Sequence, residues 1–166
     1  MGVNGKAKGS QFERTIANML SARFADKTGI TSSFRRNPDS GSFFGGSNKK
    51  RTETHDLDNA FFGDLICPDA FRFSVECKFY KTGPSFASIV KGKITQWDEW
   101  IAQAAQDASS SGKEMLLIIK YNGVDEICVL DHKILDTHID EAVRYKNFFI
   151  YRLKDMLQLS DTLFFN

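Results

Sequence analysis

The stretch GDLICPDAFRFSVECKFYK, residues 63–81, decides the fold because apolar and polar residues alternate along its second half. Residues 65–67 form a short apolar run, and Pro68-Asp69 is a turn signal. The period of two from residue 71 onward predicts a strand with two distinct faces, and the whole stretch a β-hairpin over residues 63–80. One face would hold Phe71, Phe73, Val75, Cys77 and Phe79, and the other Arg72, Ser74, Glu76, Lys78 and Tyr80.

The polar face of this strand carries Glu76 and Lys78 together, and Asp64 stands at the head of the partner strand. The simpler interpretation is a solvated face, since half-buried strands alternate in this way by default. The alternative is that the three side chains converge on a divalent cation and a phosphate group. The rest of the chain must decide between the two.

Length and composition bound the class of protein. The chain has 166 residues, of which 42% are hydrophobic and 26% charged, values that predict a single globular domain over residues 1–166. No apolar run has the length of a membrane span, and residues 1–11 lack the apolar stretch of a secretory signal. The three cysteines show no CxxC spacing and are expected to be reduced, which favours a cytoplasmic protein without a zinc site.

The charge is unevenly distributed, although the formal net charge is only +1. Residues 1–51 contain ten Lys and Arg residues against three acidic residues. A local basic patch can bind phosphates even when the molecule as a whole is nearly neutral.

Helices and strands are expected to alternate along the rest of the chain. The spacing of apolar residues predicts a helix over residues 10–24, where Ser10 and Glu13 form a capping box that would explain Glu13 without any catalytic role. The later expected elements are a helix at 89–108, strands at 115–121 and 124–130 around the Asn122-Gly123 turn, a helix at 131–145, a strand or partner-facing patch at 148–151 and a short helix at 153–159. This order predicts the α/β class, with a mixed β-sheet flanked by helices.

A long segment without helical period interrupts this pattern. Residues 31–52 are rich in Gly, Ser, Asn and Pro, with basic and aromatic residues interleaved. Loops of this length in compact domains are usually functional or disordered. We expect a mobile basic loop at about residues 35–58, which either closes over a phosphate backbone or is simply solvated.

The candidate metal site would suit phosphodiester hydrolysis. Mg²⁺ prefers hard oxygen ligands and keeps several waters, so two carboxylates and one carbonyl are enough protein ligands. Asp64, Glu76 and the backbone carbonyl of Cys77 supply that set, and Lys78 could orient the attacking water or screen phosphate charge. A tight turn at residues 68–69 would place Asp64 on the wrong face. The metal hypothesis therefore predicts a five-residue loop over residues 68–72, with Asp64 directly opposite Glu76.

At this point the chain resembles a known group of enzymes. An acidic residue followed after about a dozen residues by Glu76-Cys77-Lys78 is similar to the PD-(D/E)xK nuclease motif, with Gly63 in place of the proline. The run from Lys8 to Arg14 resembles the start of archaeal-type Holliday junction resolvases, and Arg36-Asn37-Pro38-Asp39-Ser40-Gly41 resembles their Arg-x-Pro-x-Ser-Gly loop. Gln96 and the strand around Lys120 fit the remaining pattern.

The resemblance implies a restriction-endonuclease-like fold, a homodimer, and Mg²⁺ as cofactor with Mn²⁺ able to substitute. It implies acidic active-site roles for Glu13, Asp64 and Glu76, with Glu13 a further possible metal ligand. Lys78 would be the catalytic lysine, and Ser40 would lie close to the scissile phosphate. DNA-binding residues would be Lys8 and Arg36, to which the charge pattern adds Arg35, Lys49, Lys50 and Arg51.

These observations lead to a Mg²⁺-dependent endonuclease that cleaves four-way DNA junctions by paired nicks, in a prokaryotic or phage-infected cell. Two alternatives remain open: a duplex-cutting restriction or repair endonuclease of the same fold, and a DNA-binding module without catalysis. His55 could be an extra ligand or a surface residue. The aromatic residues at 148–151 and 164–165 could belong to a dimer interface or to the core. No membrane and no small-molecule cofactor are expected.

Overall fold

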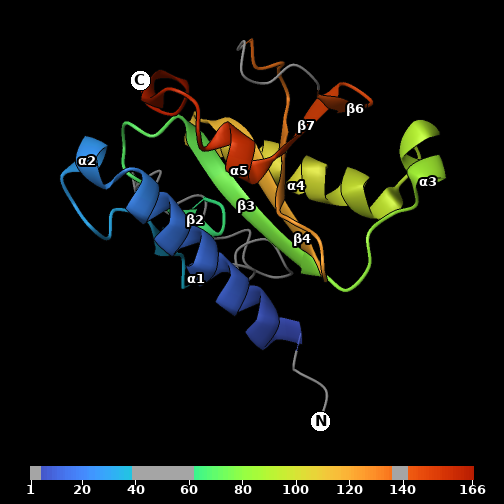
Figure 1. The fold of residues 1–166 in the computed structure, drawn as a ribbon, viewed down its shortest axis with the longest axis horizontal. Coiled ribbons are helices and arrows are strands. Elements are labelled where there is room, and N and C mark those ends of the chain that lie inside the picture. The colour runs from blue at the N-terminus through green and yellow to red at the C-terminus, as the bar shows by residue number, and fades with distance from the viewer. Residues whose placement is uncertain (1–4, 39–61, 136–141) are drawn as a thin grey trace.

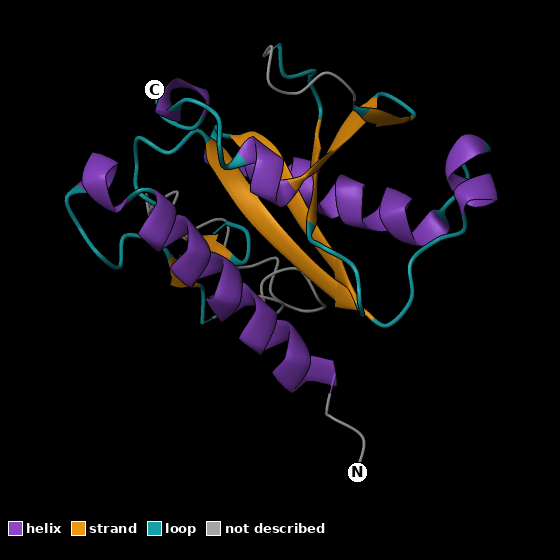
Figure 2. Ribbon diagram, in the orientation of Figure 1, coloured by secondary structure: helices purple, strands orange, loops and turns teal. Residues whose placement is uncertain are grey.

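The computed structural model of the chain describes residues 5–38, 62–135 and 142–166. Along these residues, groups of helices and groups of strands follow one another (Figures 1 and 2). The elements are α1 (Gly5–Arg23), α2 (Ala25–Thr28), β1 (Arg35–Arg36), β2 (Leu65–Ile66), β3 (Phe73–Tyr80), α3 (Phe86–Val90), α4 (Thr95–Ser111), β4 (Glu114–Tyr121), β5 (Ile127–Leu130), β6 (Val143–Tyr145), β7 (Phe148–Arg152), α5 (Leu153–Met156) and η3 (Asp161–Leu163). No helix among them is both long enough and apolar enough to span a bilayer.

A five-stranded mixed sheet forms the centre of the fold, with the strand order β3-β4-β5-β7-β6. Strands β3 and β4 are parallel over their whole length, and the other neighbours are antiparallel. Because β3 is an edge strand, its outer backbone groups are available to a segment from outside the sheet. The expected α/β class with a mixed sheet and flanking helices is confirmed.

The two faces of the sheet bury two hydrophobic clusters. Leu116 and Ile118 of β4 join a cluster with α1, while Leu117 and Ile119 join a cluster with α4. Alternating side chains of a strand point to opposite faces, so α1 and α4 cover the sheet from opposite sides. Figure 1 shows α1 on one side of β3 and α4 on the other.

The predicted helices are confirmed in part. Helix α1 begins at Gly5 instead of residue 10, so Ser10 lies inside the helix and the capping-box explanation of Glu13 is wrong. The helix predicted at 89–108 is divided into α3 and α4, and α4 ends where Gly112 takes the left-handed conformation that glycine adopts readily.

The predicted hairpin at residues 63–80 is wrong in its pairing. Strand β2 pairs with β1, in a segment predicted to be a loop, and β3 pairs along its full length with β4. The five-residue loop is also wrong, because residues 67–72 lie between the two strands. The chain turns inward here, since Phe71 is buried and forms an isolated bridge with Phe165.

The C-terminal third differs most from the expectation. The helix predicted at 131–145 is absent from its described residues: 131–135 are not helical and 143–145 form β6, while 136–141 lie outside the described part. Residues 148–151 do form a strand, β7. The aromatic pair at 164–165 is buried in the core, so the core interpretation of that pair is confirmed.

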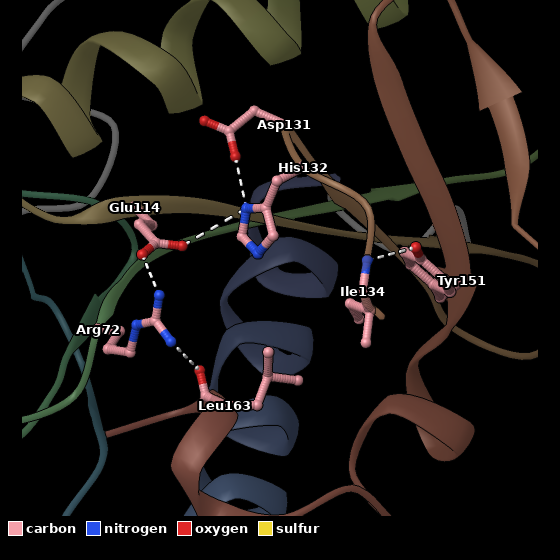
Figure 3. A network of polar contacts seen from close by, with 7 residues as sticks. All are labelled: Arg72, Glu114, Asp131, His132, Ile134, Tyr151 and Leu163. Atoms are coloured by element: carbon pink, nitrogen blue, oxygen red, sulfur yellow. Dashed lines mark hydrogen bonds and ion pairs between the residues drawn. The ribbon is translucent and has the colours of Figure 1, made fainter. Parts of the chain in front are cut away.

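A polar network fixes the C-terminal segment to the end of the sheet (Figure 3). Arg72, just before β3, binds Glu114 at the start of β4 and donates to the carbonyl of Leu163 at 3.3 Å. Glu114 is also 3.5 Å from the Nδ1 atom of His132, which follows β5. On the same side the backbone N–H of Ile134 donates to the hydroxyl of Tyr151 at 2.9 Å.

Gly63 is required at the point where the chain enters the site, and this gives a first prediction. Its φ is +80°, and a Cβ there would lie 2.7 Å from the carbonyl oxygen of Val75. We expect Gly63→Ala to lower the free energy of unfolding by about 3 kcal/mol, measured by urea denaturation, since the left-handed conformation alone costs about 1–2 kcal/mol. Gly29→Ala is the matched control, because Gly29 has φ +66° and open space around it. Equal losses in the two variants would contradict the steric argument.

Candidate active site

The outer edge of β3 receives Asp64 from the segment just before β2. The backbone N–H of Asp64 donates to the carbonyl of Val75 at 2.8 Å, and its Oδ2 accepts from the N–H of Cys77 at 2.9 Å. The predicted neighbourhood of Asp64 and Glu76 is thus present, although the hairpin that was to create it is not. In an extended strand the N–H and C=O of one residue point to the same side, so the Cys77 carbonyl faces this edge too.

Asn37, which follows β1, holds the segment around Asp64 in place. Its backbone N–H donates to the carbonyl of Asp64 at 2.8 Å, and its Nδ2 donates to the carbonyl of Gly63 at 3.0 Å. Asn37 is buried, so these bonds form away from competing water. The pairing of β1 with β2 and the bonds from Asn37 therefore hold Asp64 in position beside β3.

The second face of β3 is buried at Ser74 and Glu76 and becomes exposed only toward Tyr80, which rules out the simpler interpretation of a solvated face. Glu76 has 2% and Asp64 7% of its surface exposed. Lys78 points along the same face, and its Nζ lies 2.6 Å from Glu76 Oε1 and 3.0 Å from Gln103 Oε1 on α4. Strand alternation alone does not explain why two acids and a lysine are largely buried. Buried charges are costly unless they are paired or coordinate metals.

Burial dominates the electrostatics of both acids, and neighbouring charges modify its effect. Burial, followed by the charge of Glu76, raises the pKa of Asp64 to about 8, while the N–H of Cys77 acts against this. Burial also raises the pKa of Glu76, and Lys78 opposes it. Burial alone would lower the pKa of Lys78, but the Glu76 carboxylate outweighs it and raises that pKa. Lys78 is therefore a cation at neutral pH, and the two acids together favour a bound positive charge.

Glu13 joins the site from α1 and pairs with Arg36 of β1. Arg36 Nε lies 2.6 Å from Glu13 Oε2, and both side chains are largely buried. The Glu13 charge also raises the pKa values of Asp64 and Glu76, which indicates that it faces the same space. The contact joins two sequence motifs that are more than twenty residues apart.

Several site residues were not found from the sequence. Gln103, seven residues after the predicted Gln96, is the glutamine that contacts Lys78. Asp107, one turn further along α4, is buried, and burial followed by the Asp64 charge raises its pKa to about 6. The available signal was an acidic residue in the apolar stripe that contains Ala104 and Ala108.

The structure describes only some of the remaining predicted site residues. Lys8 lies 3.9 Å from the centre of the Phe79 ring and donates to Asn122 at 2.8 Å, and Arg35 is exposed. Ser40, His55, Lys49, Lys50, Arg51 and most of the predicted mobile loop lie outside the described residues. Their roles stay predictions.

The donor set is compatible with Mg²⁺. Asp64 and Glu76 supply two hard carboxylates beside the Cys77 carbonyl, and Mg²⁺ commonly takes one or two protein carboxylates and keeps its waters. In the described part of the chain no group of three or more His, Cys, Asp or Glu side chains has the arrangement of a metal cluster. Repulsion between the two buried acids is the feature that a divalent cation would relieve.

Comparison with known proteins points to the same chemistry. The sequence profile of a family described as "Phage putative PDDEXK endonuclease" matches residues 4–166, nearly the whole chain. Searches of curated proteins and of solved structures gave no match.

Proposed function

The chain belongs to the phage PDDEXK endonuclease family, and we propose that within it this protein is a Mg²⁺-dependent, structure-selective endonuclease that cleaves four-way DNA junctions by paired nicks. The observation that carries the metal-dependent chemistry is the buried pair Asp64 and Glu76 on one edge of β3, with Lys78 in contact with Glu76. Selectivity would come from DNA shape and from the geometry of a homodimer, since phosphate contacts alone carry no sequence information.

The choice of a junction as substrate is supported by how the resolvase-like motifs meet. The Glu13 motif of α1 and the Arg36 motif of β1 are joined by an ion pair of 2.6 Å. Asn37 from the second motif then binds the backbone of Asp64. The meeting of these three stretches of the sequence supports the site that the resemblance implies.

Each side chain has a definable task in this reaction. Asp64, Glu76 and the Cys77 carbonyl would hold Mg²⁺. A bound Mg²⁺ makes the attacking water more acidic and offsets charge on the phosphate and on the leaving oxygen. Lys78, a cation held by Glu76 and Gln103, contributes a fixed positive charge next to the phosphate. Arg36 neutralises Glu13, so that a third acid can face the site without repelling DNA.

Cleavage of matched substrates tests the proposal. Labelled four-way junction and linear duplex with the same arm sequences would be incubated with Mg²⁺ and wild-type protein or Glu76→Gln. We expect symmetric paired nicks in the junction, duplex cutting slower by about 100-fold or more, and loss of cleavage in the variant, since each 1.4 kcal/mol of discrimination is about tenfold in rate. Equal cutting of both substrates would instead indicate a duplex endonuclease of the same family. Binding without any cutting would indicate a non-catalytic module.

A further inference from the structure

The segment between β3 and α4, residues 81–93, carries features that the active site does not use. It contains Lys81, Lys91 and Lys93 and no acidic residue. All three lysines are exposed. The ion pairs found among the described residues involve none of them, whereas Lys120, Lys146 and Lys154 each bind a carboxylate.

The same segment exposes large apolar side chains on the short helix α3. Phe86 is 79% and Val90 69% exposed. Positions four apart lie on the same side of a helix, so the two side chains form one apolar patch between the flanking lysines. Figure 1 shows α3 projecting from the body of the molecule beyond the start of α4.

This surface is continuous with the active site. Tyr80 follows Lys78 on the same face of β3, is 43% exposed, and packs its ring against Trp100 with centroids 4.7 Å apart. Gln103, which contacts Lys78, lies eight residues after the start of α4. At 1.5 Å per residue, Gln103 and the start of α4 are about 12 Å apart along the helix axis. This distance corresponds to three to four nucleotides of DNA at about 3.4 Å each.

We propose that residues 80–93 form a second DNA-contacting surface, in which the three lysines hold the phosphates of a substrate arm and Phe86 stacks on an unstacked base at or near the branch point. This inference rests on the proposed function and specifies how branched DNA is recognised. Three exposed cations that flank an apolar pair along the chain match a phosphate backbone with exposed base faces. In linear duplex the base faces are covered by their neighbours, so Phe86 can distinguish the two substrates while the lysines cannot.

The test measures DNA binding in EDTA, where no cleavage occurs. It separates the contribution of the three lysines from that of Phe86. Fluorescence anisotropy would measure the affinity for labelled four-way junction and for matched linear duplex over a range of salt concentrations. Three proteins would be compared with wild type: Lys81→Gln/Lys91→Gln/Lys93→Gln, Phe86→Ser, and a control with the same change in charge, Lys27→Gln/Lys133→Gln/Lys154→Gln. All seven positions are solvent-exposed, and circular dichroism would verify that every variant is folded.

We expect the first triple variant to bind both DNAs at least about tenfold more weakly at moderate salt. Its log–log salt slope should fall by up to about 2.7, at about 0.9 per lost phosphate contact. Phe86→Ser should bind the junction about tenfold more weakly and the duplex within about twofold of wild type. The control triple should change neither slope by more than about 1.

Three results would overturn the inference. The first is that both variants bind as the control does. The second is that Phe86→Ser weakens junction and duplex binding equally. The third is that Phe86→Ser converts a dimer into a monomer in sedimentation while junction binding per protomer is unchanged, which would make α3 an interface between copies. The proposed function can fail separately, since wild type that binds junctions through this surface but never nicks them would contradict only the catalytic proposal.

Discussion

Asp64→Asn is expected to abolish cleavage and at the same time to stabilise the metal-free protein. Loss of one of two carboxylate metal ligands should lower kcat by about 10³-fold or more, equivalent to about 4 kcal/mol of transition-state stabilisation. The fold should tolerate the change, because the amide oxygen of asparagine can still accept the 2.9 Å hydrogen bond from the N–H of Cys77.

The gain in stability follows from the sign of the pKa shift. The pKa of Asp64 rises from 3.8 to about 8 in the folded protein, first through burial and then through the charge of Glu76. A group with a raised folded pKa costs no stability below its unfolded pKa and costs most once the pH exceeds its folded pKa. We therefore expect Asp64→Asn to be neutral near pH 4 and more stable than wild type by about 2–4 kcal/mol at pH 8 in EDTA.

The measurement is urea denaturation at several pH values with EDTA or Mg²⁺. Mg²⁺ should stabilise wild type and leave the variant nearly unchanged, because only the native wild-type site would bind it. Asp98→Asn is the control, because the pKa of Asp98 is shifted in the opposite direction to that of Asp64. The hydrogen bond from Lys146 lowers it, and Asp98 lies outside the site. That variant should keep full activity and gain no stability at high pH. If Asp64→Asn is less stable than wild type at pH 8, the inference that the buried Asp64 charge beside Glu76 destabilises the fold is wrong.

The elements of the fold that the sequence predicted well are those with local signals. The strand β3 and the apolar run of β4 are confirmed. The antiparallel return after Asn122-Gly123 is also confirmed, although β5 begins at Ile127 and not at residue 124. The incorrect predictions concern pairing between strands that are distant in the sequence. Nothing in Leu65 and Ile66 indicates that they pair with β1 instead of the strand that follows them, because their partners lie about thirty residues earlier in the chain.

The candidate site shows the same division. Glu76 and Lys78 could be assigned to one face because a period of two is a local property. Gln103 and Asp107 could not be assigned, since their role depends on the angle at which α4 crosses β3. Gly63 first looked like a departure from the motif. Its φ of +80° explains it, because proline, whose φ is fixed near −65°, could not occupy this position.

Lys78→Met is expected to remove most activity and also to destabilise the protein, in contrast to Asp64→Asn. Methionine retains the apolar part of the side chain and removes the charge that lies 2.6 Å from Glu76. Breaking a buried ion pair by deleting one partner typically costs about 3–5 kcal/mol. We expect a loss of about 2–4 kcal/mol in EDTA at pH 8, below the usual range because Glu76 can take up a proton. The loss in kcat should be about 10²–10⁴-fold.

A double-mutant cycle separates the structural effect from the catalytic one. Glu76→Gln/Lys78→Met no longer leaves Glu76 as a buried charge without its partner, so it should recover most of the stability that Lys78→Met loses, and it should remain inactive. Gln103→Met should reduce activity by only about tenfold, since Gln103 positions Lys78 through a single bond of 3.0 Å.

The pH dependence of kcat then identifies the role of Lys78. As the attraction of Glu76 outweighs burial and raises its pKa, the lysine stays charged throughout the neutral range. A fixed cation predicts a kcat that does not fall as the pH rises from 7 to 9. A lysine acting as general base would instead predict a rate that rises tenfold per pH unit up to its pKa, and that rise should vanish in Lys78→Met. Observation of such a lysine-dependent rise would contradict the electrostatic role and assign proton abstraction to Lys78.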